Sequence, residues 1–346
     1  MKKGFLICID GGTTNTRVRL IRLSDFSIVA KTAESIGAKD TKLKGREALE
    51  EALSTAIQRI FRENQISKEE IAGVTASGMI TSEAGLLEVP HVIAPAGIDE
   101  IASGVIEETF EKIWPDPILF IPGVKTLSNK ETPSLIERIN SQDIMRGEEC
   151  ESLGIIKLEK ISGPGIILLP GSHTKFVFIN EENRIEGSLT TLAGELANAV
   201  ISSTLIGRSV EDLDLPLIEE KYLLEGFKMA QKYGLTRSLF TIRLLHIMGE
   251  GTPLQRKCFL WGAIVGTDIM AFEESENLKK MAKSGEIVNL FVGGKSPLKE
   301  IFGTLIDVWA QEKFPKIRVK ILSSETTERS SAVGASLVAL KRIKLN

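Results

Sequence analysis

The chain has 346 residues, of which 42% are hydrophobic and 26% charged, and its formal net charge is −3. This length exceeds what one hydrophobic core usually organises, so we expect two domains. The charge gives no basic footprint for nucleic acid, and no apolar run approaches the ~20 residues that a membrane span requires. The N-terminus also lacks the apolar core of a secretion signal. We therefore expect a cytoplasmic protein that binds neither nucleic acid nor membranes.

Cysteine and histidine spacing indicates no metal or redox site. The three cysteines and three histidines are widely scattered: Cys8, Cys150, Cys258, His91, His173 and His246. This spacing fits neither a disulfide framework nor a zinc site, and we expect buried free thiols. Any metal would then arrive together with a phosphate ligand.

The first half of the chain begins with three strands at about 4–10, 16–23 and 27–33, which predict an antiparallel meander. The amphipathic pattern "GREALEEALSTAIQRIFREN" then predicts a helix, and "IAGVTASG" reads as a buried strand. "PILFIPGVKT" predicts one further strand, and "SQDIMRGEECESLGII" predicts the approach to a helix.

The second half repeats this order. "GIILLPGS", "TKFVFIN" and "RIEGSLT" predict three short strands, and helical stretches follow from about 191 to 274. Next come a strand in "EIVNLFVGGKSP", a helix, a strand "IRVKIL" and a final helix "SSAVGASLVALKRI". The repeat predicts two α/β domains, each with three antiparallel strands followed by strands that are joined through helices.

The two meanders share a hairpin rich in glycine and hydroxyl groups. Aligning "ICIDGGTTNTRV" with "ILLPGSHTKFVF" pairs Gly11 with Gly171 and Thr14 with Thr174. Glycine turns let backbone N–H groups approach an anion closely, so two such turns could clamp a chain of phosphates. A single glycine-rich hairpin is usually only a turn. Its occurrence at equivalent places in both halves of the chain is what favours phosphate binding. The predicted phosphate-binding residues are Gly11, Gly12, Thr13, Thr14, Asn15, Gly171, Ser172, His173, Thr174 and Lys175.

Asp10 ends an otherwise apolar strand, where an unpaired carboxylate would be costly to desolvate. Mg²⁺ is commonly held by one or two carboxylates together with substrate phosphates, so Asp10 is the predicted metal ligand. The alternative is that Asp10 caps its own turn.

These motifs resemble the sugar-kinase, Hsp70 and actin superfamily. "DGGTTNTRV" and "LLPGSHTKF" resemble its two phosphate motifs, "LFVGGKSPL" with Gly293 and Gly294 its adenosine motif, and "SSAVGASLVAL" its hinge helix. The resemblance implies two duplicated ribonuclease-H-like (actin-like ATPase) domains, 1–155 and 156–346, with the nucleotide cleft between them. It also implies that the final helix packs back at the hinge, and that ATP and Mg²⁺ are bound.

Within this superfamily, four segments resemble the 2-dehydro-3-deoxygalactonokinase family: "SGMITS" at 77–82, "MRGEE" at 145–149, "LPGSHTKF" at 169–176 and "AGEL" at 193–196. The resemblance implies transfer of the ATP γ-phosphate to the terminal hydroxyl of a 2-keto-3-deoxy sugar acid. One departure concerns the substrate, because Glu83 and Ala84 stand where the family has Arg and Gln, and its following Trp is also missing. The identity of the sugar acid epimer is therefore open.

The catalytic residues follow from "RGEECESLG". It resembles the kinase segment in which a carboxylate follows glycine and precedes a helix, so Glu148 is the predicted general base and Glu149 the alternative. Arg146 beside it could grip the substrate carboxylate, as arginine can bidentately. Without the resemblance, two glutamates at a helix start could simply satisfy the helix dipole. The predicted catalytic set is Glu148, Asp10 and Arg146.

Other candidates carry two interpretations each. Lys175 either neutralises phosphate or is a solvated lysine in a strand, and His173 could donate a ring N–H. Glu195 either caps a helix or contacts substrate. The predicted substrate-binding residues are Ser77, Gly78, Met79, Arg146 and Glu195.

Two other functions remain open. One is a nucleotide-gated binding module of the actin or Hsp70 type, and the other is a kinase for a different sugar or hydroxy acid. A homodimer is the default expectation for the assembly.

Overall fold

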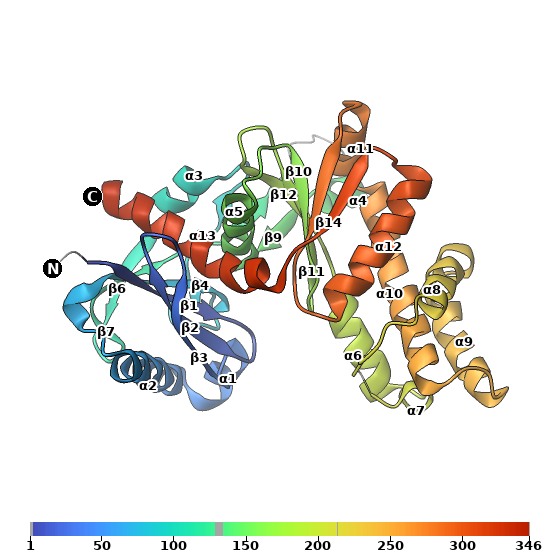
Figure 1. The fold of residues 1–346 in the computed structure, drawn as a ribbon, viewed down its shortest axis with the longest axis horizontal. Helices are drawn as coiled ribbons and strands as arrows, with labels where there is room; N and C mark the ends of the chain where they lie inside the picture. Colours follow the sequence, from blue (N-terminus) through green and yellow to red (C-terminus); the bar gives the residue numbers. More distant parts are fainter. Residues whose placement is uncertain (1–2, 129–133, 213, 346) are drawn as a thin grey trace. The chain divides into compact units, whose positions relative to one another are not determined.

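The computed structural model describes residues 3–128, 134–212 and 214–345 (Figure 1). Its elements form two compact units. Unit 1 comprises Met1–Gly163, Asn180–Gly187 and Glu325–Asn346, and unit 2 comprises Pro164–Ile179 and Ser188–Ser324. The final helix thus belongs to unit 1, although most of unit 2 precedes it in the sequence.

Unit 1 is built on a sheet whose described strands lie in the order β3-β2-β1-β4-β7-β6. β1 pairs antiparallel with β2, and β2 with β3, whereas the β1–β4 and β4–β7 pairs are parallel. The meander predicted at the start of the chain is confirmed. The strands are β1 (Phe5–Gly11), β2 (Thr16–Arg22), β3 (Ile28–Glu34), β4 (Ile71–Gly78), β6 (Ile106–Phe110) and β7 (Trp114–Phe120).

A second sheet repeats this order, as β12-β11-β10-β13-β14. β10 pairs antiparallel with β11, whereas the β10–β13 and β13–β14 pairs are parallel, as are the corresponding pairs of the first sheet. The predicted duplication of an α/β domain is confirmed by this topology. The strands are β10 (Gly165–Leu169), β11 (Thr174–Ile179), β12 (Ile185–Thr191), β13 (Val288–Val292) and β14 (Ile317–Ile321).

A third, small sheet corrects the sequence prediction. It has the order β5-β8-β9, with β5 (Val92–Ile93), β8 (Val124–Thr126) and β9 (Asp143–Met145). The segment predicted as one strand at 117–126 is two, because β7 ends at Phe120 and β8 begins in another sheet. Pro122 lacks the N–H that would continue the ladder, and a Cβ on Gly123 would lie 2.3 Å from the carbonyl oxygen of Met145.

The helices of unit 1 cover its sheet with apolar faces. The long helix α2 buries Leu49, Leu53, Ala56, Ile57 and Ile60, which confirms its predicted amphipathic face. The helices, including short 3₁₀ turns η1 and η2, are α1 (Ala38–Lys44), α2 (Arg46–Asn64), η1 (Lys68–Glu70), η2 (Met79–Thr81), α3 (Ile98–Ser103), α4 (Leu135–Asn140), α5 (Glu148–Glu159) and α13 (Ser324–Leu345).

Unit 2 packs around α10, of which most residues are buried. Phe272 of α10 stacks on Phe176 of β11 with ring centroids 4.4 Å apart, and Trp309 of α12 lies 5.4 Å from Phe272 on the same measure. The helices are α6 (Ala193–Ser203), α7 (Gly207–Val210), α8 (Glu220–Tyr233), α9 (Leu235–Ile247), α10 (Pro253–Glu274), α11 (Glu276–Lys283) and α12 (Leu298–Lys313).

The three cysteines are free and buried, as predicted. Two of them lie where α13 packs in unit 1. The Cys8 thiol contacts Ser336 of α13 at 3.5 Å, and Cys150 of α5 lies against Gly334. No helix in the described parts of the chain is both long and apolar enough to cross a bilayer.

Candidate active site

The first glycine-rich turn joins β1 to β2. It is closed by a hydrogen bond from the Gly12 N–H to the Asn15 carbonyl (2.8 Å), and Thr13, Thr14 and Asn15 are exposed. A Cβ on Gly11 would lie 2.6 Å from the Cβ of Ile80, so the segment after β4 requires glycine here. The turn therefore presents backbone and hydroxyl groups to solvent on a tightly packed base.

Asp10 lies at the end of β1 with two arginines of β2. Its Oδ2 is 3.3 Å from Nη1 of Arg17 and 3.4 Å from Nη1 of Arg19, and Ser331 of α13 donates a longer hydrogen bond at 3.5 Å. Arg17 is the direct cross-strand partner of Asp10, and Arg19 is two residues on, hence on the same face. Neither arginine was predicted from the sequence, although the R-x-R alternation opposite an aspartate was a usable signal.

The segments "SGM" and "MRGEE" meet beside Asp10. Gly78, with φ +80°, ends β4, and a Cβ there would lie 2.5 Å from the Gly11 carbonyl oxygen. A Cβ on Gly147 would lie 3.3 Å from Cα of Gly78. The structure thus brings Asp10, the end of β4 and the start of α5 together in unit 1. Ser77 is buried there, with its hydroxyl 3.5 Å from the Ile9 carbonyl, and Met79 is partly exposed.

Arg146 uses its guanidinium on the protein itself. Its Nη1 donates to the carbonyl (2.5 Å) and hydroxyl (2.7 Å) of Thr81, and its Nη2 donates to the Val89 carbonyl (2.9 Å) and lies 3.2 Å from His91. Burial, followed by Arg146 and Lys125, lowers the pKa of His91 to about 4, so the ring is neutral and can accept from Arg146. Arg146 thus ties residues 81–91 to the start of α5.

Two glutamates begin α5 in different surroundings. Glu148 Oε2 accepts from the Arg146 N–H at 3.0 Å and is partly exposed. Glu149 Oε2 accepts from the Gly147 N–H at 2.7 Å, but its side chain is fully buried, and its Oε1 has no hydrogen-bond partner among the described residues. Burial, with Glu148 as the second cause, raises the pKa of Glu149 to about 7.

Glu151 provides a third carboxyl group in this region. It was not among the site residues predicted from the sequence. Its pKa is raised to about 7, by burial first and then by the charges of Asp10 and Glu148. It follows Glu148 by three residues on α5, so the two side chains lie on neighbouring parts of one helical face. The start of α5 therefore concentrates carboxyl groups near Asp10.

In unit 2 the second glycine-rich turn joins β10 to β11 and meets the start of α6. The Glu195 N–H donates to the Ser172 carbonyl (3.0 Å), and a Cβ on Gly194 would lie 2.5 Å from the Gly171 carbonyl oxygen. His173 and Glu195 form an exposed pair with 2.8 Å between Nε2 and Oε2. The predicted phosphate turn and the "AGEL" segment are thus neighbours.

Behind this turn, Thr174 and Lys175 are buried. The Thr174 hydroxyl has no hydrogen-bond partner among the described residues, and the Lys175 ammonium donates to the Thr190 hydroxyl at 2.6 Å. Lys175 is only 4% exposed, so the interpretation of it as a solvated lysine is wrong.

The predicted adenosine motif reaches the same turn. The Gly293 N–H donates to the Leu168 carbonyl at 2.8 Å, and Gly294 has φ +83° with its missing Cβ position 2.8 Å from the Pro170 carbonyl oxygen. Gly294 therefore permits a close backbone approach between the end of β13 and the end of β10.

The fit of a magnesium ion depends on Asp10. Among the described residues, no three His, Cys, Asp or Glu side chains are grouped to hold a metal. Mg²⁺ bound with a nucleotide needs only one or two carboxylates. Asp10 fits such a role, because its side chain is 21% exposed and its Oδ1 receives no hydrogen bond from the described residues.

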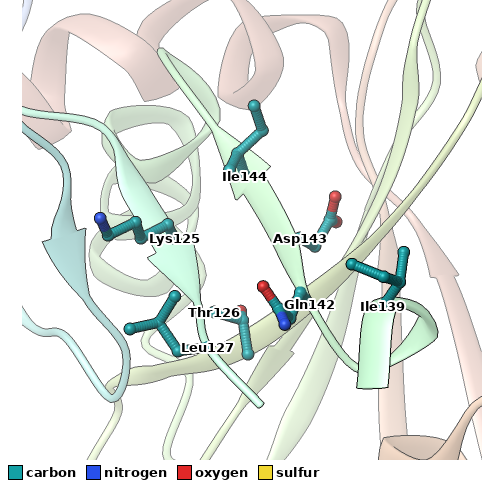
Figure 2. Close-up of a pocket in the computed structure, with 7 residues that line it drawn as sticks. All are labelled: Lys125, Thr126, Leu127, Ile139, Gln142, Asp143 and Ile144. Carbon is teal, nitrogen blue, oxygen red and sulfur yellow. The ribbon is translucent and has the colours of Figure 1, made fainter. Parts of the chain in front are cut away.

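An open pocket on unit 1 lies elsewhere, between β8, β9 and the end of α4 (Figure 2). In Figure 2 the Lys125 side chain extends away from those of Gln142 and Asp143. None of the predicted site residues lines this pocket. Its lining residues are Lys125, Thr126, Leu127, Ile139, Gln142, Asp143 and Ile144.

Two sheets of one strand order, each opening with a glycine-rich hairpin, define the actin-like ATPase fold with duplicated ribonuclease-H-like domains. A solved structure of a Sinorhizobium meliloti protein, described as a "putative 2-dehydro-3-deoxygalactonokinase protein", has the same fold. It matches with a TM-score of 0.73 and 19% identity over 96% of this chain and 98% of that one.

The sequence comparisons give the family. The model of the 2-keto-3-deoxy-galactonokinase family matches residues 10–292, and the chain belongs to this family. A Rhizobium meliloti (strain 1021) protein named "Probable 2-dehydro-3-deoxygalactonokinase DgoK1" is 21% identical over 309 residues, which cover 88% of this chain and 89% of that protein. The chain is therefore a sugar acid kinase, a phosphotransferase with an alcohol group as acceptor, and the nucleotide-gated module is not favoured.

Proposed function

We propose that the protein transfers the γ-phosphoryl group of ATP to the terminal 6-hydroxyl of 2-dehydro-3-deoxy-D-galactonate or a close 2-keto-3-deoxy sugar acid. The family match over residues 10–292 carries this proposal. The grouping of Asp10, Gly78 and the start of α5 supports it, because phosphoryl transfer needs a carboxylate base beside a phosphate turn.

ATP phosphates would be held by the two glycine-rich turns. Thr13, Thr14 and Asn15 offer exposed hydroxyl and amide groups on the first turn, and Ser172 and His173 are exposed on the second. Phosphate oxygens accept from such donors and from turn N–H groups. Lys175 would add positive charge beneath the second turn, and Gly293 and Gly294 would let the nucleotide approach the backbone.

Asp10 would hold Mg²⁺ through Oδ1, while Arg17 and Arg19 fix Oδ2. When bound, the ion would neutralise part of the phosphate charge. The two arginines orient the carboxylate, because both contact the same oxygen, Oδ2.

Glu148 is the proposed general base. It would accept the proton of the sugar hydroxyl as that oxygen bonds to the γ-phosphorus, while the bond from phosphorus to the bridging oxygen breaks and ADP leaves with the electron pair. A base must lie within hydrogen-bond reach of the proton that it takes. Glu148 is partly exposed and meets this requirement better than the fully buried Glu149.

The sugar acid would lie against Ser77, Gly78 and Met79, with Glu195 as a further candidate contact. For Arg146, the contacts with Thr81, Val89 and His91 support a positioning role in addition to the proposed carboxylate contact. Arg146 would then hold residues 81–91 against the start of α5 and so fix the position of the proposed substrate-binding residues 77–79, which directly precede them.

A substrate panel tests the proposal. ADP formation would be measured with Mg²⁺ and ATP against 2-keto-3-deoxy sugar acids, aldonic acids, free hexoses and a control without sugar. We expect only the keto-deoxy acids to stimulate turnover, with the 6-phosphate as the product. If only aldonic acids or free hexoses stimulate turnover, the substrate is of that class and not a keto-deoxy acid. If ATP is hydrolysed equally with and without sugar, the kinase proposal is contradicted. The cytoplasmic location stays a prediction.

A further inference from the structure

Helix α9 carries an apolar face that points away from the core of unit 2. Its inner face buries Ser238 and Ile242, and Leu235, Leu239 and Leu245 pack against the core. On the opposite face Phe240 is 47% exposed, Ile247 61% and Met248 71%. α9 is therefore apolar on both sides, although the described residues cover only one of them.

The outer residues form one continuous stripe. Phe240, Leu244, Ile247 and Met248 follow the i, i+4, i+7, i+8 spacing of a single helical face, and we call them the α9 stripe. Single exposed hydrophobic residues need no explanation, whereas a contiguous patch of them marks an interaction surface.

Opposite charges flank this stripe. Arg237 lies one turn before Phe240, and Glu250 follows the glycine that ends the helix. Both side chains are exposed, and neither forms an ion pair with the described residues. Arg243, at the edge of the stripe, is instead directed to His246 at 3.3 Å.

We propose that the α9 stripe binds the α9 stripe of a second copy of this chain, with the two helices antiparallel. Phe240 and Ile247 lie equally far from the point between Arg243 and Leu244, and so do Arg237 and Glu250. In a two-fold interface, residue i contacts j of the other copy while j contacts i.

This register gives apolar and charged complementarity together. Phe240 packs on the partner's Ile247, and Arg237 faces the partner's Glu250. The antiparallel arrangement also places the positive end of each helix dipole beside the negative end of the other. A different protein or a lipid surface would not need this symmetry of positions.

The interface is small. Four apolar side chains from each copy fall short of the ~800 Å² per partner of a standard interface. We therefore expect a reversible dimer with a dissociation constant in the micromolar range, roughly 1 to 100 µM.

Sedimentation equilibrium of the full chain, from about 1 to about 200 µM, measures this directly. The mass should rise from the 37.9 kDa of one chain toward twice that value. Phe240→Glu and Ile247→Glu should each raise the dissociation constant at least about 100-fold, because each change occurs twice across the two-fold axis. The matched control is Ile287→Glu, since Ile287 is 58% exposed outside the stripe, and it should leave the dimer unchanged.

Charge exchange tests the register. Arg237→Glu and Glu250→Arg should each weaken the dimer about tenfold, and the double variant should return to within about threefold of the original chain, because the opposite charges are restored. Circular dichroism and kinase activity establish that each variant is folded.

Cross-linking gives an independent measurement. Leu244→Cys lies near the proposed two-fold axis and should form a disulfide-linked dimer under mild oxidation, whereas Ile287→Cys should not. The three natural cysteines are buried and should not contribute. A chain that stays monomeric at about 200 µM, or a dimer unaffected by Phe240→Glu and Ile247→Glu, would overturn the proposal. A dimer that the double charge exchange does not restore would overturn the antiparallel register.

Discussion

Glu148 and Glu149 are adjacent in sequence but differ in what they can reach. Glu148 is partly exposed, whereas Glu149 is fully buried with its pKa raised to about 7. The buried carboxyl is half protonated near neutral pH, and its neutral form avoids repulsion of the Glu148 charge. We therefore propose that Glu149, which is fully buried, acts on the base only through its charge.

Replacing the two glutamates separately distinguishes these roles. Glu148→Gln should lower kcat by about 10²- to 10⁴-fold, the usual contribution of a general base, with little change in the KM for ATP. Glu149→Gln, the matched control, should retain most of the turnover because it preserves a neutral, isosteric side chain. Steady-state kinetics of both variants decide the assignment. The reverse ranking would make Glu149 the base.

Arg146→Lys tests whether Arg146 positions the site. The lysine keeps the charge but cannot reach Thr81, Val89 and His91 together. We expect a higher KM for the sugar acid and a stability loss of about 2 kcal/mol, because hydrogen bonds from a charged group are lost. Kinetics and thermal unfolding measure the two effects. A raised KM with unchanged Tm would indicate a carboxylate contact alone, and an unchanged KM would refute both roles.

At this scale the sequence predicted Asp10, Gly78 and Glu148 but not what surrounds them. Arg17 and Arg19 were missed because their contact with Asp10 depends on the β1–β2 register. Glu151 and His91 were missed because burial and neighbouring charges arise only in the folded chain. Sequence motifs thus identify the groups proposed to act on a ligand. The residues that set the orientation or the pKa of those groups are harder to identify from sequence.

At the scale of elements, α5 and α13 approach each other through glycines. A Cβ on Gly154 would lie 1.8 Å from the Ser330 carbonyl oxygen, and one on Gly334 would lie 1.8 Å from that of Cys150. This contact fixes the position of α5, the helix that starts with Glu148. It also explains the small residues of the helix predicted from "SSAVGASLVAL", because larger side chains would prevent the close approach.

Gly334→Ala should therefore destabilise the protein by about 1–3 kcal/mol, as overpacking does, and should lower kcat by shifting α5. Gly73→Ala is the control, because its Cβ would meet its nearest neighbour, Leu6, at an ordinary 3.6 Å. Chemical denaturation and initial rates measure both. Equal stability of the two variants would show that the helices separate at no cost.

Helix α10 carries a buried acid that predicts a pH effect. Asp268 is 7% exposed and accepts a hydrogen bond from the Thr191 hydroxyl, and burial raises its pKa to about 7. The folded state then binds more protons than the unfolded state between about pH 4 and 7. Stability from this group is therefore lost as pH rises through that window.

Asp268→Asn removes this dependence while it keeps an acceptor for Thr191. The variant should match the original chain at about pH 5 and exceed its stability at about pH 8, by on the order of 3 kcal/mol. Asp307→Asn, at an exposed aspartate of α12, is the control and should change stability equally at both pH values. Urea denaturation at the two pH values measures the difference. A pH-independent effect of Asp268→Asn would contradict the assignment.

Element types were largely predictable because periodicity is local. The meanders, α2 and the strand before Gly293 follow from apolar patterns within about ten residues. The split of 117–126 into β7 and β8, and the small sheet itself, were not predictable, because two- or three-residue strands have no pattern of their own and exist through their partners.

The whole molecule has one unit inserted in the other. The repeated hairpin predicted two duplicated domains, but contacts far apart in sequence place α13 in unit 1 with Cys8, Arg19 and Cys150. No sequence window contains both ends of such a contact, which is why the sequence gives only an approximate division.

A fragment of residues 1–163 should consequently fail to fold cooperatively. It lacks α13, so Cys8 of β1 and the side of α5 that carries Gly154 would be exposed. Joining residues 325–345 to it through a flexible linker should restore a cooperative transition, followed by circular dichroism on heating. If the fragment alone unfolds with the same transition as the joined form, α13 is not needed for unit 1.

The return of the chain to unit 1 also sets an order of events during synthesis. Roughly 160 residues separate Gly163 from Glu325. At ~5–20 residues per second, a ribosome needs about 10–30 seconds to make them. Throughout that interval the surface of β1 that awaits α13 is uncovered, while the residues of unit 2 are still being synthesised. Slow elongation or early termination near the 3′ end of the message would thus leave unit 1 as the aggregation-prone part of the nascent protein.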